Sequence, residues 1–254
     1  MTVATEPEGT LAAALCRGTL EQVVRRTGLT EVLGEDGAPH RVLTSPMSPA
    51  PVGMMRVFTG TGVVAKAVYV GISVDAIGLD SHMVFAFTRS DSALPHFTLD
   101  SVRSAEYHAF HLDLIPRVDL ASHLPYLDHC FAPLTATFEQ LSSWEGLSPA
   151  AIGPRQRALM SEWMCVNRAT EDAFRQMDGP VGDYLDHWVS LVDSGLPESV
   201  LTDLADTDLA DRDRRNRTAV FNRDVDAVWD QIARLIGDQS EAIRVELLSN
   251  EVGS

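Results

Sequence analysis

Five short runs of β-branched and aromatic residues between Met54 and Arg117 constrain the fold of this chain more than any other feature. The runs are MMRVFTG, VVAKAVYVGISV, HMVFAFT, HFTLDSV and YHAFHLDLI. Turn-prone residues separate each run from the next, which is typical of strands joined by tight turns. The connections are too short for the crossover helices that parallel neighbours need. We therefore predict an antiparallel meander of five strands.

Segments with helical periodicity lie on both sides of this meander. TLAAALCRGTLEQVVRRTG precedes it, and Gly28 is placed to end that helix. The Pro- and Ser-rich stretch TSPMSPAPVG predicts a loop before the first strand. After the meander, LPYLDHCFAPLTATFEQL predicts one helix with a cap from Ser122, and SEWMCVNRA predicts a sixth strand.

Further helices are predicted towards the C-terminus. They are TEDAFRQM joined to VGDYLDHWVSLV, then TDLADRDRRNRTAVF, and finally VDAVWDQIARLIG, which Gly237 is placed to end. One antiparallel sheet with helices before and after it is an α+β arrangement, and helices on both faces make a three-layer α/β/α sandwich. We predict a disordered N-terminus over residues 1–9, which are small, polar and acidic, and a single domain over residues 10–254.

Composition and charge exclude several classes of function. The net charge of −16 disfavours nucleic acid and anionic membranes as partners. The most apolar stretch is broken by Lys66 and Asp75, and the N-terminus lacks the basic and apolar regions of a signal peptide, so we expect a soluble, cytoplasmic protein. The sequence has no G-x-G-x-x-G, P-loop or G-x-S-x-G motif, so nothing supports dinucleotide binding, phosphoryl transfer or serine hydrolysis.

A metal site is not predicted either. The three cysteines are far apart and form no Cys-x-x-Cys pair. His108, His111 and Asp113 lie close together in the sequence, but residues three apart on a strand point to opposite faces. The two histidines are therefore not expected to share one ion.

The second predicted strand shows two different faces when its residues are separated by period two. One face carries Val64, Val68, Val70, Ile72 and Val74, and suits a core covered by helices. The other carries Ala65, Ala67, Tyr69, Gly71 and Ser73, whose mostly small side chains leave room for a flat ligand.

The strand PHFTLDS places ionisable groups where a buried strand normally carries apolar ones. His96, Thr98 and Asp100 share one of its faces. In a sheet covered on both sides, such a face is either solvated or lines a pocket. The residues alone leave both readings open.

The order and spacing of several blocks resemble one superfamily. LPHFTLDSV, HLDLIPRVDL and LPYLDHCFAPL, followed by the C-terminal FNRDVDAVWDQIARLIG, are similar to blocks of the ferredoxin-dependent bilin reductases and red chlorophyll catabolite reductases. The resemblance extends from about Val57 to the C-terminus. It implies an α/β/α sandwich that binds an open-chain tetrapyrrole between its sheet and its C-terminal helices.

The resemblance also implies a function and a set of site residues. Electrons would arrive singly from reduced ferredoxin, with no bound cofactor and no metal, and carboxylic acids would supply protons. The two acids of the family correspond here to Asp100 and Asp226. Raised pKa values, produced by burial against an apolar ligand, would suit both for this role.

Other candidate substrate-binding residues follow from the same match. A histidine that the phycocyanobilin-forming members carry on the neighbouring strand corresponds here to Met83, with His82 adjacent on the opposite face. His96 is a candidate replacement. Arg117 matches a basic position of the chlorophyll-catabolite branch and is a candidate partner for a propionate. Thr98 and Tyr69 complete the candidate set.

Two questions stay open at the level of the sequence. The first is where an acidic ferredoxin docks. The segment RDRRNR (Arg212, Arg214, Arg215 and Arg217), with Arg25, Arg26 and Lys66, is a candidate positive patch, whereas ion pairs with nearby aspartates are the alternative. The second is the reaction itself. The alternatives to a bilin reductase are a secondary-metabolism tailoring enzyme acting on another planar conjugated substrate, and a non-catalytic tetrapyrrole-binding protein.

Overall fold

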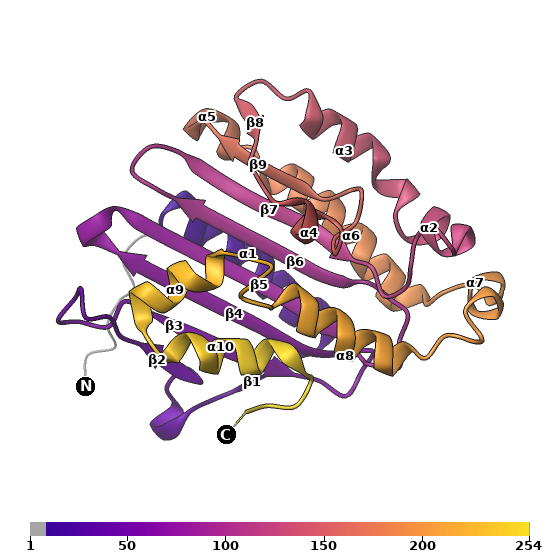
Figure 1. The fold of residues 1–254 in the computed structure, drawn as a ribbon, viewed down its shortest axis with the longest axis horizontal. Helices are drawn as coiled ribbons and strands as arrows, with labels where there is room; N and C mark the ends of the chain where they lie inside the picture. The colour runs from indigo at the N-terminus through magenta and orange to yellow at the C-terminus, as the bar shows by residue number, and fades with distance from the viewer. Residues whose placement is uncertain (1–8, 254) are drawn as a thin grey trace.

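A nine-stranded antiparallel sheet occupies the centre of the computed structural model, which describes residues 9–253 (Figure 1). The strand order is β1-β3-β4-β5-β6-β7-β9-β8, and β2 also pairs with β3. The strands are β1 (Thr30–Val32), β2 (Arg41–Leu43), β3 (Gly53–Thr59), β4 (Val64–Val74), β5 (Leu79–Thr88), β6 (His96–Arg103), β7 (His108–Ile115), β8 (Leu147–Pro149) and β9 (Cys165–Ala169). The predicted disordered segment lies, except for Gly9, outside the described residues.

The predicted meander is confirmed as β3 to β7, and β9 is the predicted sixth strand. The connections are tight. The one between β4 and β5 is a single 3₁₀ turn, η2 (Asp75–Ile77), closed by Gly78 at a φ of 62°. One assignment of faces was wrong. A register shift between Val64 and Lys66 turns Val64 towards the face of Ala67 and away from Val68, because a bulge changes the alternation.

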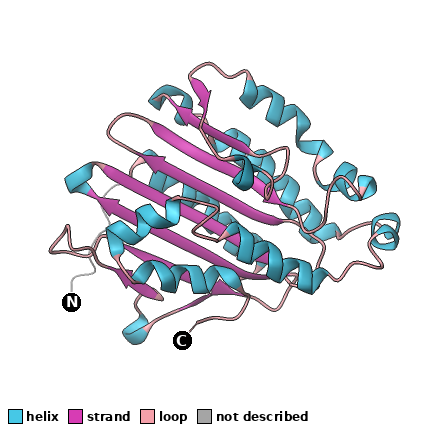
Figure 2. Cartoon of the chain, in the orientation of Figure 1, coloured by secondary structure: helices cyan, strands magenta, loops and turns pink. Residues whose placement is uncertain are grey.

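Helices cover both faces of the sheet, so the predicted three-layer α/β/α sandwich is confirmed (Figures 1 and 2). The helices α1 (Leu11–Thr27) and α6 (Asp178–Ser194) pack on one face. The C-terminal helices α8 (Leu209–Val220), α9 (Val228–Ile236) and α10 (Gln239–Leu248) pack on the other. Each face therefore has its own apolar core.

Two predicted helix ends are confirmed by backbone conformation. Gly28 follows α1 with a φ of 68°, and Gly237 follows α9 with a φ of 62°. Glycine adopts this left-handed region without the steric cost that a Cβ brings. The loop predicted over 44–53 is also present, and β3 begins at its last residue.

The single helix predicted after the meander was wrong. The segment is divided into α2 (Leu124–Cys130), the 3₁₀ turn η3 (Ala132–Leu134) and α3 (Thr135–Ser142). Pro133 lies at this division. The helix is interrupted there because the proline ring prevents a continuous α-helix. Ser122 does not cap α2, since its hydroxyl donates to Asp119 instead.

The remaining helices are short. They are η1 (Glu35–Gly37), α4 (Pro154–Arg157), α5 (Glu171–Phe174), which is separate from α6, and α7 (Glu198–Asp203). Within residues 9–253, no helix combines the length and the apolar character needed to cross a membrane.

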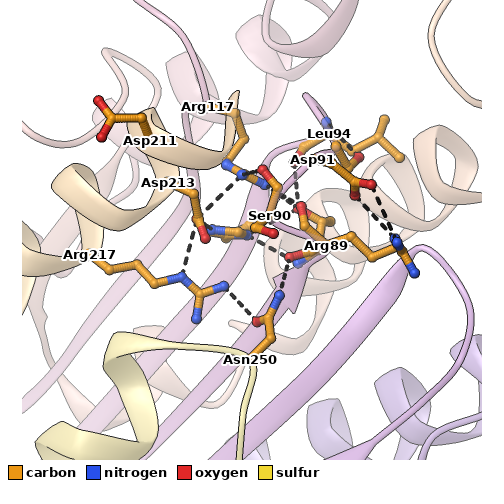
Figure 3. Close-up of polar contacts among 12 residues, drawn as sticks. Arg89, Ser90, Asp91, Leu94, Arg117, Asp211, Asp213, Arg217 and Asn250 are labelled. Atoms are coloured by element: carbon orange, nitrogen blue, oxygen red, sulfur yellow. Dashed lines mark hydrogen bonds and ion pairs between the residues drawn. The ribbon is translucent and has the colours of Figure 1, made fainter. Parts of the chain in front are cut away.

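A buried polar cluster fixes α8 to the sheet (Figure 3). Asp213 of α8 accepts from His96 Nε2 at 2.9 Å and from Arg217 Nε at 3.1 Å, and lies 3.3 Å from Arg117 Nη2. Asn250 accepts from Arg217 Nη2 at 2.7 Å and donates to the Thr88 carbonyl at 3.2 Å. We call His96, Arg117, Asp213, Arg217 and Asn250 the Asp213 cluster. It ties the C-terminal segment and α8 to one end of β5–β7.

A second buried contact holds the segment after α10. Lys66, the only lysine in the sequence, donates from Nζ to Glu246 Oε2 at 2.6 Å and to the Glu251 carbonyl at 2.6 Å. Glu246 also accepts from the Gly253 amide at 2.7 Å. The Lys66 side chain is fully buried, so the C-terminal segment covers it.

Candidate active site

A cavity of about 500 Å³ lies between the sheet and the C-terminal helices. Its sheet wall consists of Met83 and Phe85 from β5, Thr98 and Asp100 from β6, and His111 from β7. The opposite wall comes from the 151–164 connection and from α8, α9 and the turn between them. It includes Gln156, Met160, Phe221, Asp226 and Trp229. The volume lies within the usual range for small-molecule sites.

Asp100 lies at the centre of the sheet wall with a different neighbour on each side. Met83 of β5 and His111 of β7 are its direct cross-strand partners. His111 Nδ1 lies 3.3 Å from Asp100 Oδ2, whereas Met83 offers only a thioether. The polar side of Asp100 therefore faces β7.

His111 carries a raised pKa in this position. Burial alone would lower the pKa, but the hydrogen bond and negative charge of Asp100, with the charges of Asp113 and Asp226, outweigh it. Within the described chain, His111 Nε2, Asp100 Oδ1 and Thr98 Oγ1 are buried without a hydrogen-bond partner. All three residues line the cavity. Buried polar atoms are normally paired, so these three favour a polar ligand group at this wall.

Asp226 lies on the opposite wall, in the turn between α8 and α9. Its Oδ1 accepts from the Val228 amide at 3.0 Å, and its Oδ2 accepts from Gln156 Nε2 at 3.1 Å. Burial raises the pKa of Asp226, and the negative charge of Asp100 raises it further. The hydrogen bond from the Val228 amide acts in the opposite direction but is outweighed. The cavity thus has a carboxyl group on each wall.

A third carboxyl group, Asp113, lies beneath the cavity on β7. It is fully buried, and accepts from the Ser161 amide at 3.0 Å and from the Ser161 hydroxyl at 2.5 Å. Burial raises its pKa to about 7, although the nearby His111 opposes this. The contact fixes the 151–164 connection to the sheet beside Met160 and Met164, which line the cavity.

The structure brings four of the sequence-predicted residues to this cavity: Met83, Thr98, Asp100 and Asp226. His96 shares the face of Thr98 but belongs to the Asp213 cluster. It accepts from the Thr88 amide at Nδ1, and its pKa is lowered by burial and by Arg117, so it is a neutral imidazole that donates from Nε2.

The other three predicted residues lie away from the cavity. Arg117 is buried in the Asp213 cluster, where its guanidinium also donates to Thr88 Oγ1 and to the carbonyls of Arg89 and Ser90 (Figure 3). Tyr69 and His82 lie on the opposite face of the sheet beneath α1, with Tyr69 Oη 2.7 Å from His82 Nδ1.

The face of β4 that was expected to receive a flat ligand is therefore the face beneath α1. A smaller hollow of about 300 Å³ lies there, beside Tyr69 and His82. The larger cavity opens on the opposite face, which carries Val68 and Val70 on β4.

Sequence reasoning missed His111 as a site residue. It was considered only as a metal ligand with His108, and the two histidines do point to opposite faces. The available signal was hairpin symmetry. A turn centred on Ala105 and Glu106 places residue 111 opposite residue 100, and this is the observed register. In residues 9–253, no group of three or more His, Cys, Asp or Glu side chains forms a metal site.

The predicted basic patch was wrong in two of its members. Arg217 is buried and stacks on the Phe87 ring at 3.9 Å, and Lys66 is buried against Glu246. Of the helix residues, Arg214 and Arg215 remain exposed, and both pair with Asp211. The segment is thus partly structural and partly an exposed surface on which two arginines share a single aspartate.

Comparison with known proteins identifies the fold. The arrangement of an antiparallel sheet between two helical layers is the fold of the bilin reductases, as the sequence resemblance implied. A solved structure with this fold is phytochromobilin synthase from tomato in complex with biliverdin. It has a TM-score of 0.72 and 18% sequence identity, over 94% of this chain and 84% of that chain. No protein-family model and no curated protein matches the sequence.

Proposed function

We propose that this chain is a ferredoxin-dependent reductase of a linear tetrapyrrole or a closely similar bilin-like substrate. The observation that carries the proposal is the cavity, which has a carboxyl group on each wall, Asp100 and Asp226. The tomato phytochromobilin synthase, which has the same fold, was solved in complex with biliverdin. Apolar side chains of the helical wall, including Phe221 and Trp229, offer a surface for flat rings.

The two acids have separate roles in this proposal. Electrons arrive one at a time from reduced ferredoxin, and each reduced intermediate takes up a proton. Asp100 protonates from the sheet wall and Asp226 from the helical wall, so their positions determine which carbons receive the protons. The raised pKa of Asp226 keeps a fraction of this group protonated closer to neutral pH, as a proton donor requires.

The test begins with binding and continues with turnover. Biliverdin added to the protein should give a saturable change in visible absorbance, and reduced ferredoxin under anaerobic conditions should then convert the bound pigment. Asp100→Asn should retain binding and slow turnover on the order of 100-fold or more, because the amide cannot supply the proton. Normal turnover by Asp100→Asn would refute the role given to Asp100.

The last part of the proposal concerns where the electron donor docks. An acidic ferredoxin must approach a protein of net charge −16, so local positive charge is required. The exposed Arg214 and Arg215 of α8 are the candidates. Changing both to Glu should raise the KM for ferredoxin without weakening biliverdin binding. Changing both Arg25 and Arg26 of α1, which covers the opposite face, to Glu is the matched control. Equal effects of both changes would argue against docking at α8.

A second candidate function is favoured by Met83. The thioether lies beside Asp100 at the position that corresponds to a histidine in the phycocyanobilin-forming enzymes. This difference suits a tailoring enzyme that acts on another planar conjugated substrate. Saturable binding and conversion of such a compound, with no response to biliverdin, would favour it. Tight biliverdin binding with no electron uptake would instead indicate a tetrapyrrole-binding protein.

A further inference from the structure

His111 is a polar residue of the cavity to which neither the sequence reasoning nor the proposed function gives a role. It projects from β7 directly opposite Asp100, on the side away from Met83. Its Nδ1 faces Asp100 Oδ2 at 3.3 Å, and its side chain is only 15% exposed. No other cross-strand neighbour of Asp100 offers an ionisable group, since the opposite partner is Met83.

The two ring nitrogens of His111 have different surroundings. Nδ1 faces Asp100 Oδ2, whereas Nε2 is buried without a partner among the described residues and belongs to a side chain that lines the cavity. A protonated imidazole donates from both nitrogens. His111 can therefore hold a proton next to Asp100 while its other nitrogen contacts a ligand.

The charged groups around His111 favour its cationic form. Asp100 faces it from β6, Asp113 lies two residues along its own strand, and Asp226 approaches from the turn between α8 and α9. Gln156 of α4 also lines the cavity, and it is uncharged. The cross-strand partner of His111 on β9 is the apolar Val166. Burial lowers the pKa of His111, but the carboxyl groups outweigh it and the pKa is raised.

We propose that His111 reloads Asp100 with a proton between the two one-electron reductions. This inference rests on the proposed function. In the first step, one electron from ferredoxin and the Asp100 proton pass to the substrate, which leaves Asp100 as a carboxylate. The N–H bond at His111 Nδ1 then breaks as an O–H bond forms at Asp100 Oδ2. A proton from water restores the imidazolium, and Asp100 is ready for a second proton transfer. Each electron is thus balanced by one proton.

The test follows the two reductions separately. In His111→Gln, biliverdin binding and the first reduction should resemble the wild type, because the inference gives His111 no part in the first proton transfer. The second step should slow on the order of 100-fold, so that a one-electron-reduced radical accumulates and gives an electron paramagnetic resonance signal. In the wild type, the rate of the second step should fall as pH rises through the pKa of His111. Added imidazole should restore part of the rate in His111→Ala.

The matched control is His123→Gln. This change also breaks a histidine–aspartate contact, His123 Nδ1 to Asp203 Oδ2 at 2.8 Å, but it lies between the residue that precedes α2 and the end of α7, and neither residue lines the cavity. Its second step should be normal. A normal second step in His111→Gln, or no restoration by imidazole, would overturn the inference and leave the reductase proposal in place.

A measurement without substrate separates the inference from the proposed function. Histidine resonances followed by NMR over pH 5–9 should give His111 a pKa above the usual value near 6.5. Asp100→Asn should lower it, because the main favourable charge is lost. A His111 pKa at or below the usual value in the wild type would also overturn the inference. If the pKa of His111 is raised but the protein takes up no electrons from reduced ferredoxin, the proposed function is refuted. The inference that His111 reloads Asp100 with a proton then fails with it.

Discussion

Asp213→Asn should destabilise the protein severely, because it leaves two arginines without their buried counterion. One carboxylate oxygen of Asp213 lies within 3.3 Å of Arg117, Arg217 and His96. Both arginine side chains are only 1% exposed. Removal of one partner from a buried ionic group costs about 3–5 kcal/mol, a large share of the roughly 5–15 kcal/mol that stabilises a typical domain.

The assay is unfolding by urea and by heat, with Asp211→Asn as the control. Asp211 is on the same helix and also pairs with two arginines, but these are exposed. We expect a loss of about 0–1 kcal/mol for the control and a fall in the melting temperature on the order of 10 °C for Asp213→Asn. If the two variants differ by less than about 1 kcal/mol, the argument from burial is wrong.

The pH dependence gives an independent check on the same change. His96 and the two arginines hold the pKa of Asp213 below its ordinary value, despite the opposing effect of burial. A carboxyl group with a lowered folded-state pKa stabilises the protein above its unfolded pKa, near 4, and this contribution is lost as pH falls through the folded value. The difference in stability between wild type and Asp213→Asn should therefore be constant from pH 6 to 8 and shrink below pH 4.

The same variant also tests Arg117. If Arg117 bound a substrate propionate, Asp213→Asn would leave it more available and biliverdin binding would be kept or strengthened. If Arg117 only supports the fold, Arg117→Met should lower stability while the folded fraction binds biliverdin normally. Loss of binding by Arg117→Met without loss of stability would restore its role as a substrate ligand.

Two further predictions concern other parts of the fold. Gly71→Ala should destabilise by about 1–3 kcal/mol, since its Cβ would lie 2.7 Å from a tyrosine hydroxyl, whereas Gly179→Ala, with open space around it, should be neutral or stabilising in the same urea titration. Asp113→Asn should gain stability relative to wild type as pH rises from 4 to 8, because burial raises the folded pKa of Asp113 to about 7 and ionisation then favours the unfolded chain. Urea midpoints at pH 5 and 8 measure this, and an unchanged difference would contradict it.

The meander could be predicted from the sequence because its signal is local. Period-two runs separated by turns too short for helices leave few alternatives to an antiparallel sheet. The bulge beside Val64 could not be predicted, since an extra residue in one strand leaves no mark in composition. Pro133 was a local signal for the break between α2 and α3, and it was available in the sequence.

The candidate site was predicted only in part, for a different reason. Asp100 and Asp226 were found through family resemblance, and the structure places both at one cavity. His111 required the register of a single hairpin, because a shift of one residue moves every side chain to the other face. The burial of Arg117 and Arg217 required a long-range partner, Asp213, that no local pattern identifies.

The buried position of Lys66 has a consequence for chemical labelling. Acylating reagents and lysine-modifying enzymes need an accessible ε-amine, and the only lysine of this sequence has its amine enclosed by Glu246 and the 249–251 carbonyls. While the C-terminal segment is in place, no lysine side chain is open to acetylation. The rate at which an acylating reagent modifies Lys66, followed by mass spectrometry, therefore reports how often that segment detaches from the sheet.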